Sequence, residues 1–231
     1  MYVPDLRRSF RSGANDMVVV KQADGSLKST PPQVIVGKCN TLKTFCKSRS
    51  GRVAKIYVNG MQVLPNTKIV LGESGTAVIK EKQASCSYTF INEELQSMAL
   101  EEGLNYALLV VTDLNAEIPF NIFLLDQTSK LVVTDVDGTI TKSDVRSFIG
   151  SKCGFDVHHS NVVEFFHKVS ENGYLVVYLT ARPMGWHGST RKYLFRTLQN
   201  TDGGFSLPLE PLYMSPTPTI KTVIAYSEAI K

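Results

Sequence analysis

The chain has 231 residues, of which 43% are hydrophobic and 20% charged, and its formal net charge is +4 at pH 7. This composition is that of a globular chain with room for one large or two modest domains. The sequence holds no apolar run near the roughly 18 residues of a membrane-spanning helix, and we expect no secretory signal at its start. The mild positive charge favours anionic partners such as phosphate-bearing membrane surfaces or nucleic acid. Free thiols in a reducing compartment are expected at Cys39, Cys46, Cys86 and Cys153, which lack paired metal-ligand spacing.

The first twelve residues combine apolar and basic side chains at helical spacing. A short amphipathic segment of this kind contacts an anionic membrane surface without crossing it. A solvated tail is the alternative, because Pro4 interrupts the pattern and the segment is short. The apolar members are Val3, Leu6 and Phe10, and the basic members are Arg7, Arg8 and Arg11.

Residues 13–128 have the pattern of a β domain. Short apolar runs are separated by turn signals such as Asp24-Gly25 and Asn59-Gly60. Several short strands of this kind predict an immunoglobulin-like β-sandwich, with a linker near residues 81–103 and strands from both sides of that linker in one fold. The expected strands cover residues 18–20, 33–36, 55–58, 68–71, 106–112 and 118–125.

From Lys130 the pattern changes to strands alternating with helices, which predicts an α/β domain over residues 129–231. A buried strand is expected over residues 131–134 and a second over residues 174–179. Between them, Asn161 precedes an expected helix as its cap, and Gly173 ends it. The apolar face of this helix is expected to hold Val162, Val163, Phe166 and Val169.

Two aspartates, Asp135 and Asp137, follow the first of these strands directly, and Thr180 follows the second. Ligands of open α/β sheets bind beyond the carboxyl ends of the strands. One carboxylate there can attack phosphorus, and a second can act as general acid and base. A hairpin turn and a calcium loop are the alternatives for the aspartate run, but a calcium loop needs its glycine at position six, and Gly138 is at position four.

Several segments resemble the lipin family within the haloacid-dehalogenase superfamily of phosphatases. The resemblance begins at residues 135–144, which look like the first motif of that superfamily in its lipin form. Lipins are magnesium-dependent phosphatidate phosphatases that make diacylglycerol. Further similar segments are residues 16–28, 36–38, 58–60 and 71–75 in the amino-terminal part, and residues 167–174, 180–185, 190–194 and 212–216 in the carboxyl-terminal part.

The resemblance implies a role for each residue of the motifs. Asp135 would be the nucleophile and a ligand of Mg²⁺, and Asp137 would be the general acid and base. Asp137 would also bind the metal, through its backbone carbonyl. Thr139 would hold the loop after the strand, and Thr180 would donate a hydrogen bond to a phosphoryl oxygen. A cation is needed on physical grounds too, because a phosphate monoester facing two carboxylates is strongly repelled.

The resemblance also implies where the protein acts. The expected substrate is phosphatidic acid in membranes, and the expected location is the cytoplasm, peripherally on endoplasmic reticulum or nuclear-envelope membranes, with no direct binding of nucleic acid. Trp186 is a second expected membrane contact, with a packed loop anchor as its alternative. Lys142, Arg146 and Arg182 are expected near the catalytic edge, facing lipid phosphate or solvent.

One family feature is missing from the sequence. The late acidic motif that completes the magnesium site is not found, since no aspartate follows Asp202. We therefore expect the α/β domain to be incomplete at its carboxyl-terminal end. The alternative function is a membrane- or lipid-binding module with little or no turnover.

Overall fold

The computed structural model describes residues 12–36, 51–67, 69–71, 77–79, 89–142, 158–198 and 204–216. The expected amino-terminal membrane contact at Leu6, Arg7, Arg8, Phe10 and Arg11 lies outside these residues, as do the four cysteines and Arg146. The chain divides into two compact units. The first is Met1–Gln127 with Met184–Gly188, and the second is Thr128–Pro183 with Ser189–Lys231.

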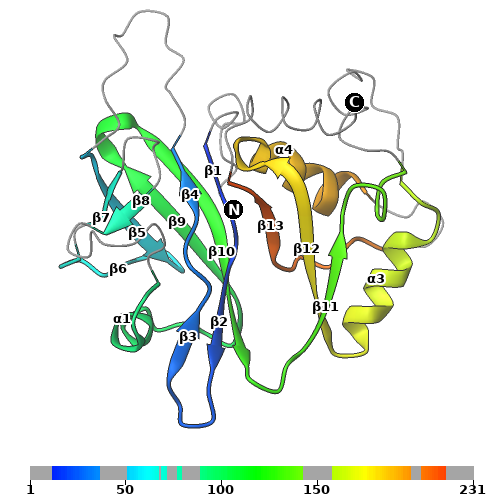
Figure 1. Cartoon of the computed structure of the whole chain (residues 1–231), viewed down its shortest axis with the longest axis horizontal. Coiled ribbons are helices and arrows are strands. Elements are labelled where there is room, and N and C mark those ends of the chain that lie inside the picture. The colour runs from blue at the N-terminus through cyan, green and yellow to red at the C-terminus, as the bar shows by residue number, and fades with distance from the viewer. Residues whose placement is uncertain are drawn as a thin grey trace, which may run out of the picture. The chain divides into compact units, whose positions relative to one another are not determined.

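The first unit is built mainly of β-strands (Figure 1). Its large sheet has eight strands in the order β3-β2-β10-β9-β5-β7-β8, with β6 paired to β5. A separate two-stranded sheet pairs β1 with β4. The elements are β1 (Gly13–Ala14), β2 (Met17–Lys21), β3 (Leu27–Ser29), β4 (Val34–Ile35), β5 (Val53–Val58), β6 (Met61–Val63), β7 (Ile69–Leu71), β8 (Ala77–Ile79), helix α1 (Asn92–Ser97), β9 (Gly103–Val111), the 3₁₀ turn η1 (Thr112–Leu114) and β10 (Ala116–Asp126).

One strand joins the two halves of this sheet. β10 pairs antiparallel with β9 and parallel with β2, and Ile122 lies opposite Met17 in the parallel pair. The backbone N–H of Asn121 also donates to Oδ1 of Asp16, which is 2% exposed, at 2.8 Å. Strands before and after the expected linker therefore belong to one sheet.

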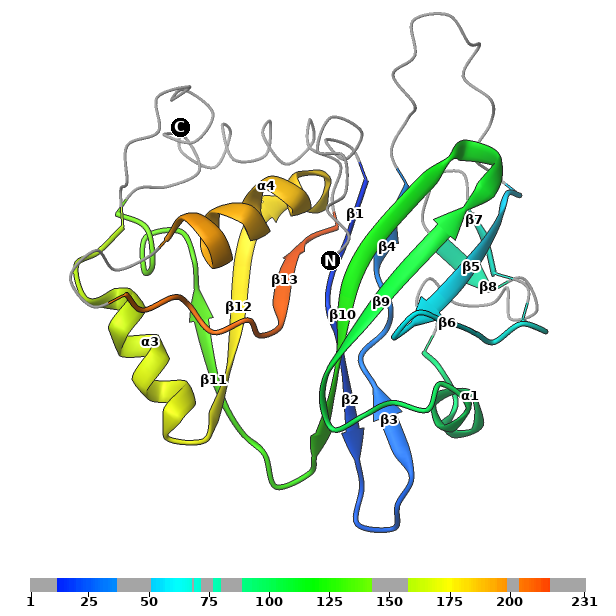
Figure 2. The same cartoon turned by 180° about the vertical axis from the view of Figure 1, so that it is seen from behind.

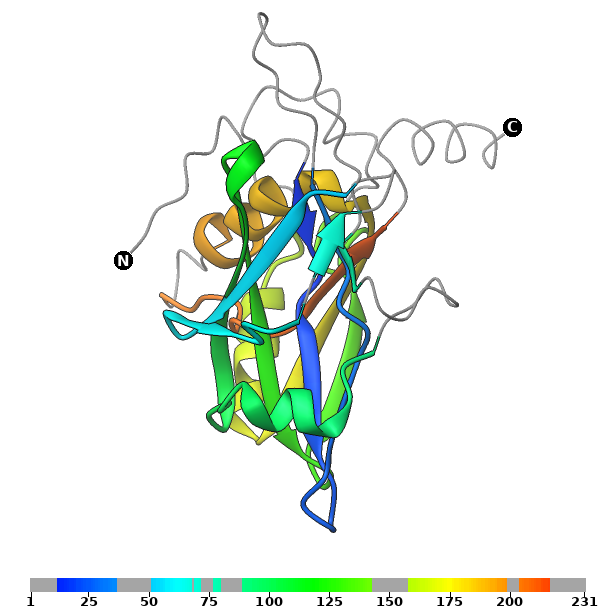
Figure 3. The same ribbon diagram turned by 90° about the vertical axis from the view of Figure 1, so that its left-hand side faces the viewer.

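The sheet is curled, and its core lies on one face. In Figure 3 the cyan strands run at a steep angle to the blue ones. Burial alternates along β9, where Ala107, Leu109 and Val111 are buried and Tyr106 is 63% exposed. This period of two is that of a strand with one face in a core. The described strands form one large sheet and a small pair, so the immunoglobulin-like sandwich is not confirmed.

The second unit is an α/β arrangement, with a parallel sheet in the order β11-β12-β13. Figure 2 shows β12 between the other two strands. Helix α3 packs against β12, and the Phe166 ring meets the Tyr178 ring edge-on at 6.3 Å. The elements of this unit are β11 (Lys130–Asp135), α3 (Val162–Glu171), β12 (Tyr174–Pro183), the π-helical turn η3 (Tyr193–Thr197) and β13 (Leu212–Ser215). The 3₁₀ turn η2 (Met184–Trp186) belongs to the first unit, and the residues of α4 (His187–Lys192) are divided between the two units.

Helix α3 begins and ends close to the predicted residues. Val162, Val163 and Phe166 are buried, and Gly173 has φ of +78° after the last turn. The cap is different from the prediction, because Asn161 has a left-handed backbone and its side chain makes no capping hydrogen bond. Its backbone carbonyl accepts from the N–H of Phe165 instead. None of the helices in the described part of the chain is long and apolar enough to cross a membrane.

Candidate active site

The parallel register of β11 and β12 brings their carboxyl ends together. Asp135 lies opposite Leu179, so the residues that follow β11 lie beside Thr180 and Arg182 in the last part of β12. The N–H of Val136 donates to the carbonyl of Leu179 at 2.9 Å, which continues the pairing one residue beyond β11. This edge is where ligands bind in parallel α/β sheets.

The loop after β11 is braced by Thr141, which is 4% exposed. Its hydroxyl donates to the carbonyl of Val136 at 3.3 Å and accepts from the N–H of Gly138 at 3.4 Å. Gly138 has φ of +95°, a conformation that favours glycine. Thr139, the residue expected to hold the loop, is exposed.

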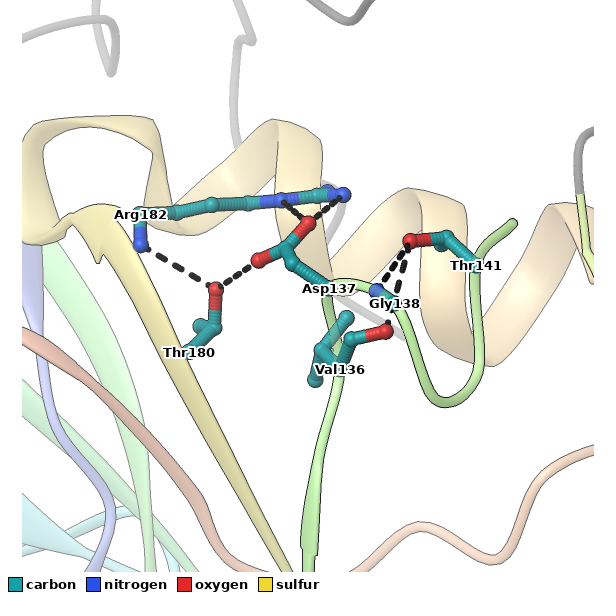
Figure 4. A network of polar contacts seen from close by, with 6 residues as sticks. All are labelled: Val136, Asp137, Gly138, Thr141, Thr180 and Arg182. Carbon is teal, nitrogen blue, oxygen red and sulfur yellow. Dashed lines mark hydrogen bonds and ion pairs between the residues drawn. The ribbon is translucent and has the colours of Figure 1, made fainter. Parts of the chain in front are cut away.

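The Asp137 side chain is bound by two residues of β12, Thr180 and Arg182 (Figure 4). Its side chain is only 5% exposed. The Thr180 hydroxyl donates to Oδ2 of Asp137 at 2.6 Å. Nε and Nη2 of Arg182 both donate to Oδ1, at 3.0 and 2.7 Å. Charge-assisted bonds of this length are among the strong ones in proteins.

Arg182 is itself buried, with 2% of its side chain exposed. Its backbone N–H donates to the Thr180 hydroxyl at 3.1 Å, so the two donors to Asp137 are also joined to each other. The guanidinium carbon lies 5.7 Å from the centre of the Tyr193 ring, within cation–π range. Arg182 is thus held on three sides: by Asp137, by Thr180 and by an aromatic ring.

Asp135 differs from Asp137 in its surroundings. It is the last residue of β11 and is exposed, whereas the Asp137 side chain is buried in the network described above. An attacking carboxylate must be open to its substrate, and a general acid and base must be held in place. The two aspartates therefore differ in exposure.

A magnesium ion would find some of its ligands here. Mg²⁺ binds oxygen and commonly takes one or two carboxylates together with substrate phosphate and water. The exposed Asp135 carboxylate and the Asp137 backbone carbonyl are donors of that kind. Both side-chain oxygens of Asp137 already accept hydrogen bonds, so this residue would contribute its carbonyl. Within the described ranges, no cluster of three or more His, Cys, Asp or Glu side chains is placed to hold a metal.

The structure gives Arg182 a place that the sequence did not indicate. It was expected beside lipid phosphate or solvent, yet it is paired with Asp137 inside the protein. The available signal was the strand period, because Thr180 and Arg182 are two residues apart and share one face. Lys142 is exposed, as expected, and Trp186 is half-buried in η2.

His158 and His167 both belong to the second unit. His158 forms a bridge with Thr141 and lies beside the loop. His167 lies on α3, where Nε2 is 3.3 Å from Oε1 of Glu171 and the ring contacts Phe205. His167 thus lies on the surface of α3, between Glu171 and Phe205.

The chain thus contains a β unit and an α/β unit that carries Asp135 and Asp137 at the end of β11 and Thr180 in the last part of β12. Comparison with protein families identifies this combination. Residues 86–230 match the family LNS2 (Lipin/Ned1/Smp2), and residues 2–99 match the lipin N-terminal conserved region. The chain therefore belongs to the lipin family.

Curated relatives agree with the family. Nuclear elongation and deformation protein 1 of Schizosaccharomyces pombe is 33% identical over 152 residues, which are 65% of this chain and 23% of that protein. Phosphatidic acid phosphohydrolase 1 of Saccharomyces cerevisiae is 35% identical over 140 residues, 61% of this chain and 16% of the relative. Phosphatidate phosphatase LPIN1 of Homo sapiens is 35% identical over 129 residues, 54% of this chain and 14% of the relative. The matched regions thus span 23% or less of these relatives.

Proposed function

We propose that this protein is a magnesium-dependent phosphatidate phosphatase of the haloacid-dehalogenase type, which converts phosphatidic acid to diacylglycerol through an aspartyl-phosphate. The observation that carries the proposal is the pair of aspartates at the carboxyl end of β11: Asp135 is exposed, and Asp137 is held by Thr180 and Arg182. Membership of the lipin family supports it, as do relatives named as phosphatidate phosphatases.

In the first step, a carboxylate oxygen of Asp135 attacks the phosphorus of phosphatidic acid. An O–P bond forms to Asp135 while the bond from phosphorus to the glycerol oxygen breaks, and Asp137 gives its proton to the departing alkoxide. In the second step, water attacks the aspartyl-phosphate and Asp137 takes a proton from that water, which releases phosphate and restores Asp135. Bound Mg²⁺, held by Asp135 and the Asp137 carbonyl, would neutralise charge on the phosphoryl group.

Thr180 would take part in binding the phosphoryl group. Its hydroxyl lies in the last part of β12 and donates to Asp137 Oδ2 at 2.6 Å. A hydroxyl donor can exchange one acceptor oxygen for another by rotation. Thr180 therefore donates to Asp137 in the free protein and to a phosphoryl oxygen when substrate is present. Thr139, exposed in the loop after β11, would be the other phosphate contact.

The substrate places the reaction at a membrane surface. We propose that the protein works from the cytoplasm, bound peripherally to anionic membranes such as those of the endoplasmic reticulum or nuclear envelope. The basic residues Arg7, Arg8 and Arg11 beside Leu6 and Phe10 would supply one contact, worth about 1 kcal/mol for each arginine. Trp186 would be the second. Binding to vesicles that contain phosphatidic acid should then weaken as salt concentration rises.

The direct test is to remove the nucleophile without changing its shape. Asp135→Asn should lose phosphate release from phosphatidic acid in mixed micelles, because an amide forms no aspartyl-phosphate. EDTA should abolish the activity of the wild-type protein, and Mg²⁺ should restore it. Asp24→Asn, in the exposed β2–β3 turn, is the matched control and should keep the wild-type rate. Retained activity in Asp135→Asn, or full activity in EDTA, refutes the mechanism.

Substrate class needs a separate comparison. If the protein acts on phosphatidic acid, its kcat/KM in mixed micelles should exceed that on a small soluble phosphate ester by at least about tenfold. A higher rate on the soluble ester would assign the same chemistry to soluble phosphomonoesters instead.

The second candidate is a lipid-binding module with little or no turnover. It is favoured by the formal net charge of +4, which attracts the chain to anionic lipid surfaces. The retained, exposed Asp135 speaks against it. Vesicle co-sedimentation and phosphate release, measured on the same preparation, separate the two: binding without release supports the module, and release supports the enzyme.

A further inference from the structure

The two oxygens of the Asp137 carboxylate are held in different ways. Oδ1 accepts two hydrogen bonds from the guanidinium of Arg182, at 3.0 and 2.7 Å, whereas Oδ2 accepts from the neutral Thr180 hydroxyl. The guanidinium is planar and rigid, and its position is fixed further by burial and by the Tyr193 ring. A hydroxyl, by contrast, can rotate away. Oδ1 is therefore the fixed oxygen of Asp137, and Oδ2 is the one that can be released.

We propose that Arg182 is the positioning residue for the general acid and base. This inference rests on the proposed function. Arg182 holds Oδ1 throughout the reaction, and Thr180 leaves Oδ2 when its hydroxyl turns to the phosphoryl group. Oδ2 then carries the proton to and from the reacting oxygens, while the carboxylate as a whole stays in place. Figure 4 shows this division, with Arg182 and Thr180 on different oxygens of Asp137.

Two other roles for Arg182 make different predictions. A phosphate-binding arginine would be exposed to the substrate. The Arg182 side chain is only 2% exposed, and its Nε and Nη2 both donate hydrogen bonds to Asp137. A purely structural ion pair would affect stability and leave turnover alone. A positioning residue changes kcat with little effect on KM, because a misplaced catalytic group impairs the chemical step and not substrate binding.

The test compares Arg182→Met and Arg182→Lys with the wild-type protein on phosphatidic acid in mixed micelles with Mg²⁺. Arg182→Met removes both donors to Oδ1, and a displacement of about 1 Å in a catalytic group costs roughly 100-fold in rate. We therefore expect kcat to fall about 100-fold with KM changed by less than about twofold. Arg182→Lys keeps a single donor and should lie between the two. Arg196→Met, an exposed arginine in η3, is the matched control and should keep the wild-type kcat.

A double-variant cycle with Asp137→Asn shows whether the two residues act together. If Arg182 works only through Asp137, the Asp137→Asn change should cost far less kcat in the Arg182→Met background than in the wild type. Three results would each overturn the inference. The kcat losses of the two single variants could multiply in the double variant, KM could increase in Arg182→Met, or Arg182→Met could keep the wild-type kcat. Urea unfolding of the same variants identifies any that fail to fold. If Arg182→Met fails to fold, the kcat and KM of Arg182→Lys test the inference in its place.

The wild-type protein separates this inference from the function on which it rests. If the folded wild type releases no phosphate from phosphatidic acid with Mg²⁺, the proposed function falls and the positioning role falls with it. If the wild type is active and Arg182→Met is equally active, only the inference on Arg182 is wrong.

Discussion

Glu210 is a buried carboxylate that completes an edge of the α/β sheet, and its replacement should destabilise the second unit. β13 begins at Leu212 and pairs with β12 from Tyr178 onward. The N–H of Val176 lies earlier in β12, and it donates to Oε2 of Glu210. The Ser170 hydroxyl, on α3, donates to Oε1 at 2.8 Å. One side chain that is 8% exposed therefore joins β12, α3 and the segment before β13.

The size of the effect follows from the groups that Glu210→Ala leaves behind. Val176 is fully buried, so its N–H would lose its partner without gaining water. A buried unpaired donor costs about 1–3 kcal/mol, and the half-buried Ser170 hydroxyl adds a smaller amount. We expect Glu210→Ala to lower the free energy of unfolding by about 2–4 kcal/mol in urea titrations at neutral pH. Ser170→Ala, which leaves the Val176 contact intact, should cost less than about 1.5 kcal/mol. A loss below about 1 kcal/mol in Glu210→Ala refutes this account.

The same carboxylate gives a dependence of stability on pH. Burial raises the pKa of Glu210 above its ordinary value of 4.5, although the hydrogen bonds from Val176 and Ser170 oppose the shift. An acid whose pKa is raised by folding binds its proton more tightly in the folded state. Its contribution to stability is full below the unfolded value of 4.5 and is lost as pH rises through the folded value. Glu210→Gln should therefore gain stability relative to wild type as pH rises. A difference that stays constant from about pH 4 to about pH 8 contradicts this.

Two further predictions concern a close backbone contact and the Thr180 hydroxyl. Gly13→Ala should lower the free energy of unfolding by about 1–3 kcal/mol, because a Cβ at Gly13 would lie 1.9 Å from the carbonyl oxygen of Met184 within the first unit; a change below about 0.5 kcal/mol in urea unfolding would contradict it. Thr180→Val, which removes the donor to Asp137 Oδ2, should lower kcat on phosphatidic acid at least about tenfold, and Thr180→Ser should retain most of the activity. Equal kcat values for the valine and serine variants would show that the hydroxyl has no role.

Local patterns predicted the elements of the second unit well. The apolar run before Asp135 is β11, and the three- and four-residue spacing of Val162, Val163 and Phe166 is the buried face of α3. These features depend on residues near one another in sequence, which a periodic pattern reports directly. The cap of α3 was less predictable, because Asn161 tolerates a left-handed backbone as readily as a capping conformation.

Strand partners were not predictable in the same way. A period of two shows which face of a strand is buried, but it does not show which strand pairs with which. β10 pairs with β2 in parallel, and both belong to one eight-stranded sheet, where the sequence predicted an immunoglobulin-like sandwich. Long-range register depends on the joint packing of many strands, and no local segment carries that information.

The amino-acid sequence by itself determined which polar residues come at the ends of the two expected strands: Asp135 and Asp137 at the first, and Thr180 at the second. Only the tertiary structure decided how these side chains differ. It leaves Asp135 exposed and places Asp137 against Arg182, a residue 45 positions away in the sequence. The physical reason is that a charged group is buried only where a partner compensates the lost hydration, and that partner is supplied by the neighbouring strand of the folded sheet.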